Sequence, residues 1–327
     1  MRGRLMLMLG VIISGIALWI VVRSIDVGAT LATLATADIR LLVLIVAIIA
    51  AQVVLRAVRW SLLIPTTPRI GFGRLVPPLL IGYLGNAVLP ARLGEPMRAV
   101  IVSRRERIDT VQSLGSVLLE RIIDVASLAP IALLAAVVTG APMWTIQVGA
   151  IATLAGGAAV AVLATTGIHP LLRLADHLAL TRRASVRSIM NRLAHVLGGS
   201  SRRGPMGQAA GISLIAWMLD AASFWLAAQA LGIDISFAAA TLVAAITVLG
   251  TAIPSAPGYV GTFELAASSV AIALGVPPES AVAMAILAHA MMLLPPAIAG
   301  AVSLLIVGST LGEVASATRS DEAETAA

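Results

Sequence analysis

Most side chains that could do chemistry in this sequence are charged residues inside long apolar segments. Glu120, Arg121 and Asp124 share one such segment, whereas Asp220 and His289 stand alone in two others. A charge in a segment that crosses the hydrocarbon core costs ~2.5–3.5 kcal/mol on insertion scales, so such residues are rare and usually functional. We therefore treat all of them as candidate functional residues, with Asp220 and His289 as candidate proton relays.

The spacing within 120–124 leaves two interpretations open. Glu120 and Asp124 are four residues apart and would share one helix face, whereas Arg121 and Asp124 are three apart and could pair within the helix. An internal pair is the cheapest way for a helix to carry charge in lipid. These residues are thus either substrate ligands or a structural ion pair with one further carboxylate.

More polar residues lie in two apolar stretches, 75–103 and 237–274, which proline and glycine interrupt. Those that we select as candidate substrate-binding residues are Asn86, Arg92, Glu95, Arg98, Gly258, Gly261 and Glu264. Arginine side chains bind phosphate oxygens bidentately, and helix N-termini beside a break offer free backbone N–H groups to an anion. The two interruptions therefore favour a site for a phosphate group.

Other chemistries find little support in the composition. The sequence has no cysteine, and its 4 histidines lack the spacing of a metal site, so we expect neither a metal nor another cofactor. All 22 basic residues are arginine. A GC-rich genome would produce this bias, although arginine also suits phosphate binding.

Membrane-spanning helices must position these residues, because the sequence is 59% hydrophobic and only 12% charged. Such a chain is too apolar to be soluble, and several apolar runs exceed the ~18 residues of a transmembrane helix. We expect an all-α, polytopic membrane protein with a single domain over 1–310, a disordered cytoplasmic tail over 311–327, and no nucleic-acid partner. The expected full spans are 5–22, 41–55, 111–138, 145–166, 207–231 and 281–307.

Charge bias predicts the topology, because loops on the cytoplasmic side are rich in arginine. The arginines sort to one side only if 75–103 and 237–274 are re-entrant hairpins that enter from opposite sides. Arg56 and Arg59 then face the cytoplasm, as do both termini, and the protein lies in the inner membrane. The insert 168–205 has one apolar helical face, which predicts an amphipathic helix on the inner leaflet.

The two interrupted stretches resemble each other. Each contains the pattern Leu-Gly-x-Ala, and each ends in a glycine followed within three residues by a carboxylate, Glu95 or Glu264. Inverted repeats with discontinuous helices are common in transporters, although the prolines and glycines could also serve two tight turns. Non-helical backbone at membrane depth must avoid lipid, so we expect Glu95 and Glu264 to face one shared cavity.

Three ordered motifs lie at 85–98 (Gly-Asn-Ala-Val-Leu-Pro-Ala-Arg-Leu-Gly-Glu-Pro-Met-Arg), 118–124 (Leu-Leu-Glu-Arg-Ile-Ile-Asp) and 254–264 (Pro-Ser-Ala-Pro-Gly-Tyr-Val-Gly-Thr-Phe-Glu). Together they resemble the flippase-like family that shares its membrane region with lysylphosphatidylglycerol synthases. The resemblance implies a translocator or carrier of a lipid with a charged head group. It implies no synthase activity, because the cytosolic aminoacyl-transfer domain of the synthases is missing here. Where the family pattern leads us to expect an arginine, this chain has His289, which can titrate.

Three functions follow as hypotheses. We favour a flippase or carrier, not an enzyme, for a phospholipid, glycolipid or polyprenyl-phosphate-linked intermediate, in which Arg92 and Arg121 are the principal phosphate ligands. The second hypothesis is an intramembrane lipid-modifying enzyme that uses Glu95, Glu264 and His289 as acid and base groups. The third is a non-transporting partner of a lipid synthase or glycosyltransferase. The oligomeric state is left open.

Overall fold

The computed structural model describes residues 2–89, 92–165, 187, 192–193, 203–251 and 255–307. Every regular element in these ranges is a helix, which confirms the all-α prediction. Most of the insert 168–205 and the tail 311–327 lie outside the described residues.

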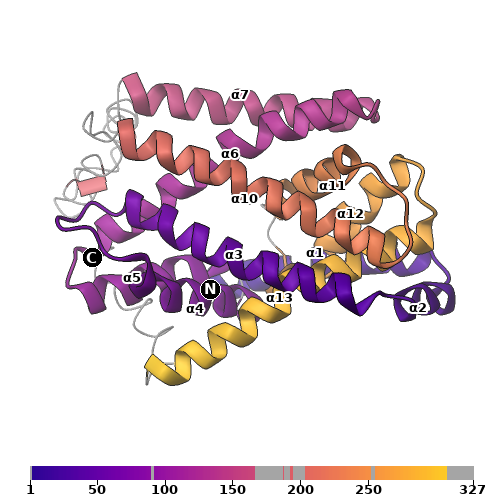
Figure 1. Ribbon diagram of the computed structural model, residues 1–327, viewed down its shortest axis with the longest axis horizontal. Helices are drawn as coiled ribbons and strands as arrows, with labels where there is room; N and C mark the ends of the chain where they lie inside the picture. The colour runs from indigo at the N-terminus through magenta and orange to yellow at the C-terminus, as the bar shows by residue number, and fades with distance from the viewer. Residues whose placement is uncertain are drawn as a thin grey trace.

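Long apolar helices form most of the molecule and run along its longest axis (Figure 1). Five are long and apolar enough to cross a bilayer: α3 (Ile39–Leu63), α6 (Thr110–Val138), α7 (Met143–Thr165), α10 (Arg203–Ala230) and α13 (Pro278–Val307). Helix α1 (Arg2–Arg23) forms a sixth candidate together with α2 (Val27–Ala35), at an angle of 87°. The protein is thus a multi-pass membrane protein, as expected.

The bend between α1 and α2 has a local cause that the sequence reading missed. Asp26 adopts an extended backbone, and its side chain accepts a hydrogen bond from the Ala29 N–H at 3.0 Å. This N-cap satisfies a backbone donor at the start of α2 and stabilises a new helix in place of a continuation of α1.

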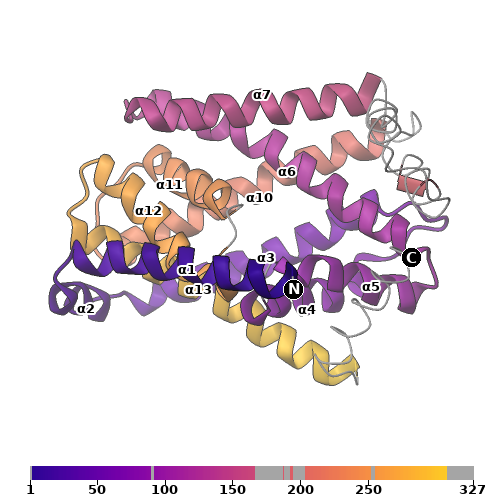
Figure 2. The ribbon, with the colours of Figure 1, turned by 180° about the vertical axis from the view of Figure 1, so that it is seen from behind.

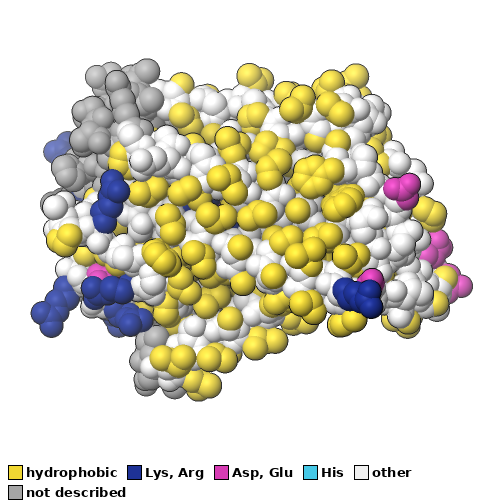
Figure 3. Space-filling view, viewed as in Figure 1, with side chains coloured by type: hydrophobic (Ala, Val, Ile, Leu, Met, Phe, Trp, Pro, Cys, Tyr) yellow, Lys and Arg dark blue, Asp and Glu magenta, His cyan; other side chains and the backbone are white. Residues whose placement is uncertain are grey.

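Apolar side chains cover the middle of the face seen in Figure 3, and most of its visible arginines gather at one end. Acidic side chains are visible mainly at the opposite end. A band of apolar surface between two polar ends is what a bilayer requires of a protein that crosses it. The cytoplasmic orientation of the arginine-rich end stays a prediction.

Two helix pairs are broken at the predicted places. The first is α4 (Phe72–Val88) with α5 (Gly94–Glu106), and the second is α11 (Phe237–Gly250) with α12 (Thr262–Ala273), joined through the short 3₁₀ helix η4 (Pro257–Tyr259). Figures 1 and 2 both show the first pair toward one end of the molecule and the second pair toward the other. The re-entrant course of the two pairs stays a prediction.

The first break follows from a proline and a close helix contact. Leu89 is extended because the residue before Pro90 is excluded from the helical region. Helix α5 then restarts at Gly94, whose missing Cβ would stand 1.9 Å from the Gly82 carbonyl oxygen. Only glycine allows α4 and α5 to approach so closely.

The second break uses a different device. Gly261 has φ 86° and forms the N-cap of α12, a conformation that glycine adopts without strain. The Gly261 N–H donates to Glu264 Oε2 at 2.7 Å, so the glutamate closes the first turn of its own helix. The helices on both sides of this break, α10 to α13, contribute most of the largest apolar core of the described structure, which includes Phe224 and Met284.

Candidate functional site

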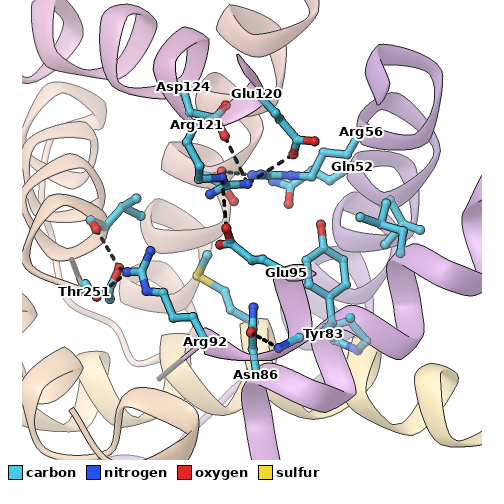
Figure 4. A pocket seen from close by; sticks show the side chains of 18 of the residues that line it. Gln52, Arg56, Tyr83, Asn86, Arg92, Glu95, Glu120, Arg121, Asp124 and Thr251 are labelled. Carbon is cyan, nitrogen blue, oxygen red and sulfur yellow. Dashed lines mark hydrogen bonds and ion pairs between the residues drawn. The ribbon is translucent and has the colours of Figure 1, made fainter. Parts of the chain in front are cut away.

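A cavity of about 300 Å³ lies between the two broken pairs and the helices α3, α6, α10 and α13. It has the volume of the smallest ligand pockets in proteins, which is enough for a small polar group. Eight charged side chains line it: Arg56, Arg92, Arg98, Arg121, Glu95, Glu120, Asp124 and Asp220. The structure therefore brings together most of the charged residues selected from the sequence, which come from distant segments (Figure 4).

Arg121 forms the structural ion pair expected from its motif, and it also lines the cavity. It pairs with Asp124 within the helix at 3.3 Å, and with Glu120 at 3.1 Å. It also reaches Glu95 on α5 at 3.6 Å, and Figure 4 shows the two side chains pointing toward each other. Since 35% of its side chain stays exposed, Arg121 is a structural partner that remains accessible from the cavity.

A fully buried arginine, Arg59, shares the partner Glu120 with Arg121, and its position was predicted wrongly from the sequence. Arg59 donates from Nη2 to Glu120 Oε1 at 2.6 Å, and from Nη1 to Ser213 Oγ at 2.7 Å and to Asp124. The prediction that Arg59 faces the cytoplasm was wrong because α3 continues past residue 55 to Leu63. Its charge is thereby carried into the protein interior.

Arg56 was misplaced for the same reason. It forms an ion pair with Asp220 at 2.7 Å and lies over the Trp217 ring, 5.2 Å from its centroid. Asp220, a predicted proton relay, thus has an arginine partner from α3. Both residues line the cavity.

Arg98 joins the same charge network from α5. Its Nη2 donates to Glu120 Oε2 at 3.0 Å, and its guanidinium lies over the Trp60 ring at 4.6 Å. The other terminal nitrogen, Nη1, is buried and has no acceptor within the described part of the chain, and the same is true of Trp217 Nε1. Both atoms belong to residues of the cavity wall.

Arg92 differs from the other arginines of the cavity. It has a left-handed backbone, with φ 55°, and its side chain crosses to the second broken pair. There it donates to the carbonyl oxygen of Thr251 and to Thr251 Oγ1 at 2.8 Å, and it lies over the Tyr259 ring at 5.3 Å. Glu95 turns to Arg121, and Arg92 forms no ion pair with any described carboxylate.

The remaining candidates support the breaks more than the cavity wall. Asn86 does both: it lines the cavity, and its Oδ1 accepts from the Gly94 N–H at 3.1 Å, which ties α4 to the start of α5. Gly258 (φ 69°) and Gly261 shape the second break, and neither lines the cavity. Tyr259, between them, does line it.

Glu264 and His289 form a separate buried pair. His289 Nδ1 lies 2.5 Å from Glu264 Oε1, while Glu264 Oε2 caps α12. Neither residue is part of the cavity wall. The expectation that Glu95 and Glu264 share one cavity was therefore wrong, because Glu264 turns back onto its own helix and onto α13. Within the described ranges, no group of His, Asp and Glu side chains is arranged to hold a metal.

The sequence profile described as the lysylphosphatidylglycerol synthase TM region matches residues 7–300. This chain belongs to that family. The match covers every charged residue of the cavity. This chain is also similar to the protein named Glycosyltransferase AglD from Haloferax volcanii, with 26% identity over 347 aligned positions. The alignment covers 94% of this chain and 55% of AglD, so the chain spans about half the length of that relative.

Membership of this family indicates a lipid-related function in the membrane.

Several residues of the cavity wall were not selected from the sequence. They are Gln52, Arg56, Tyr83, Trp217, Thr251 and Tyr259. A signal was present for two of them, since Gln52, Arg56 and Arg59 are spaced to form a polar stripe on one helix face. Thr251 occupies the position of Asn86 in the Leu-Gly-x-Ala pattern, so the repeat also pointed to it.

Proposed function

We propose that this protein binds the phosphate group of a membrane lipid in the cavity and carries that lipid across the bilayer. The lipid is a phospholipid, a glycolipid or a polyprenyl-phosphate-linked intermediate. One observation carries the proposal: the cavity combines clustered guanidinium groups with buried donors that have no acceptor among the described residues.

The charge balance of the site favours an anion. Arg59 and the 4 arginines of the cavity wall stand against 4 carboxylates, which leaves one positive charge in excess. Arg92 accounts for this excess, because its partners Thr251 and Tyr259 are uncharged. A phosphodiester, with its single negative charge, would complete the balance.

Hydrogen bonding favours the same ligand. Arg98 Nη1 and Trp217 Nε1 are both donors, and each is buried without an acceptor in the described structure. A buried donor that lacks a partner costs ~1–3 kcal/mol, which a ligand oxygen would recover. A ligand rich in acceptor oxygens, such as a phosphate, suits these positions, whereas an ammonium group does not.

Movement requires a site that can exchange partners. Arg121 contacts Glu95 across the break at only 3.6 Å, and a phosphate could replace this contact at little cost. The two broken pairs lie toward opposite ends, an arrangement in which transporters alternate access around a central site. We propose a carrier rather than an enzyme, because Glu95 is separated from the other acid and base candidates, Glu264 and His289.

The decisive test replaces Arg92 with glutamine in purified protein reconstituted into vesicles that contain fluorescent phosphatidylglycerol. We expect lipid movement to slow roughly 10- to 100-fold, because a hydrogen bond to a charged group contributes ~1.5–3 kcal/mol. Arg121→Gln should behave similarly. Lysine at either position should restore movement only in part, since it keeps the charge but lacks the planar fork.

Arg74→Gln is the matched control, because Arg74 is 67% exposed and pairs with Glu106 away from the cavity. It should leave the rate unchanged. If folded Arg92→Gln and Arg121→Gln proteins move lipid at the parent rate, the phosphate site lies elsewhere. Native mass spectrometry of the purified protein would identify any retained lipid directly.

The name of the relative AglD suggests a second candidate, in which this chain serves a glycosyltransferase as a membrane partner without moving lipid. Purified protein would then show no lipid movement in vesicles. It would instead raise the activity of a co-reconstituted lipid glycosyltransferase, which the carrier proposal does not require.

A further inference from the structure

We propose that Glu264 and His289 form a proton-binding site whose occupancy controls the affinity of the cavity for its anionic lipid. This inference rests on the proposed function and adds an ion that acts on it. The geometry is that of a close pair, with His289 Nδ1 and Glu264 Oε1 2.5 Å apart. Histidine is the residue type that can exist charged or neutral, whereas arginine always keeps its charge.

The pair is buried deep in the protein. Glu264 and His289 are 8% and 6% exposed. His289 is about 17 Å along α13 from Pro278, at 1.5 Å per residue, and so lies toward the middle of that helix. The Phe263 ring stacks on the imidazole with centroids 4.2 Å apart, and His289 Nε2 has no partner among the described groups. Glu264 is thus the group that responds directly to the charge of the imidazole.

No other titratable group in the described structure bonds to this pair. The elements packed against α12 and α13 are α1, α2, α3, α4, α10 and α11, of which α2 and α11 carry no titratable side chain. Together with α13 itself, the others contribute a set of titratable side chains that the structure describes: Arg23, Arg40, Arg56, Arg59, Arg74, Tyr83, Asp220 and Glu279. None of these is hydrogen-bonded or ion-paired to Glu264 or His289. No other described titratable group therefore bonds to the pair and compensates a change in its charge.

Two short routes connect the pair to the cavity. Glu264 holds the Gly261 N–H, and Tyr259, two residues earlier, lines the cavity beneath the Arg92 guanidinium. On the other side, Met292 and Leu293 follow His289 by about one helical turn and also line the cavity. A change in the pair can thus reach the phosphate site through either helix.

The sign of the coupling follows from charge. With an imidazolium the pair is neutral overall, whereas with a neutral imidazole it carries one negative charge. An uncompensated negative charge in a medium of low dielectric constant repels an anion nearby. Proton binding therefore strengthens lipid binding, and by reciprocity lipid binding promotes proton uptake.

The test measures binding of phosphatidylglycerol to the purified full-length protein in detergent between pH 5 and pH 8. We expect the wild-type affinity to rise as the pH falls, by up to about tenfold per pH unit for one linked proton. His289→Arg should bind with high affinity at every pH, because it keeps a permanent ion pair with Glu264. His289→Gln should lose the slope, and Arg74→Gln, which changes an exposed ion pair with Glu106, should keep it.

The outcomes separate the two proposals. A wild-type affinity without pH dependence, or a slope that survives in folded His289→Arg and His289→Gln, overturns the coupling and leaves the proposed function standing. No phosphatidylglycerol binding by the wild type at any pH, together with no phosphate-bearing lipid retained in native mass spectra, overturns the proposed function itself. Proton uptake on lipid addition, read with a pH dye in weak buffer, needs no variant, so the test does not depend on their folding. Its absence during lipid binding also overturns the coupling.

Discussion

Arg59 is 0% exposed and donates to two carboxylates and a serine, whereas Arg92 reaches across the cavity to the uncharged partners Thr251 and Tyr259. Both would be costly in lipid without compensation, yet the compensation differs. For Arg59 it is permanent and internal. For Arg92 it is weaker, and a ligand phosphate can improve it. At the scale of single residues, partner chemistry thus distinguishes the structural charge of Arg59 from the proposed ligand-binding charge of Arg92.

This distinction predicts that Arg59→Gln lowers stability sharply. Removing one partner from a buried ion cluster costs ~3–5 kcal/mol, because Glu120 and Asp124 lose their shared cation. The fall should appear as a lower midpoint of thermal unfolding in detergent. Arg74→Gln, which breaks an exposed pair with Glu106, should cost no more than ~1 kcal/mol. Equal midpoints for the two variants would contradict the assignment.

The two breaks place the charged residues, and they do so by different means. At the first, Asn86 accepts from the Gly94 N–H, and Gly94 lies against Gly82. At the second, Glu264 caps α12 through Gly261. The similar sequence patterns therefore do not give equivalent side-chain roles, since Glu95 enters the cavity network and Glu264 does not.

Gly94→Ala should disrupt the first helix pair. The added Cβ would stand 1.9 Å from the Gly82 carbonyl oxygen, so α4 and α5 must separate. Overpacking typically costs ~1–3 kcal/mol, and the shift would also misplace Glu95 and Arg98. Reduced thermal stability together with loss of lipid movement is the expected result.

The control for this change is Gly157→Ala on α7. A Cβ there meets nothing within 4 Å, and α7 contributes no residue to the cavity wall. Alanine in a helix interior is favoured over glycine by ~1 kcal/mol, so this variant should be as stable as the parent or more stable. If Gly94→Ala were as well tolerated as Gly157→Ala, the close approach of α4 and α5 would be refuted.

On the face seen in Figure 3, exposed arginines gather mainly at one end and exposed acidic side chains mainly at the other, whereas the cavity wall holds a cluster of paired charges in the interior. The positive-inside bias acts on loops near the spans, so it predicts that the arginine-rich end is cytoplasmic. The interior charges lie outside these loops, so the bias does not apply to them. Arg56 and Arg59 belong to the interior and should not be counted when the topology is assigned.

Because the chain contains no cysteine, single cysteines can test the orientation directly. Arg105 and Asp234 are both exposed, near the α5–α6 and α10–α11 connections respectively. We expect Arg105→Cys to react with a membrane-impermeant maleimide only from the cytoplasmic side, and Asp234→Cys only from the outside. Labelling of Arg105→Cys in intact cells would reverse the topology.

The sequence alone determined the all-helical membrane fold, the approximate positions of most spans, the two breaks and most of the charged cavity residues. These features are local: an apolar run long enough to cross a bilayer, or a proline within a helix, has its effect wherever it is placed. The ion pair between Arg121 and Asp124 could be predicted for the same reason, because residues three apart on a helix are neighbours.

Only the tertiary structure decided which charges meet. Arg56 and Asp220 are 164 residues apart, and Arg92 reaches Thr251 over 159 residues. No local pattern specifies such partners, because they depend on how α3 packs against α10 and how the first break faces the second. The same packing sets Glu264 against His289 and keeps it out of the cavity. A buried charge must find a partner, but long-range packing selects which one.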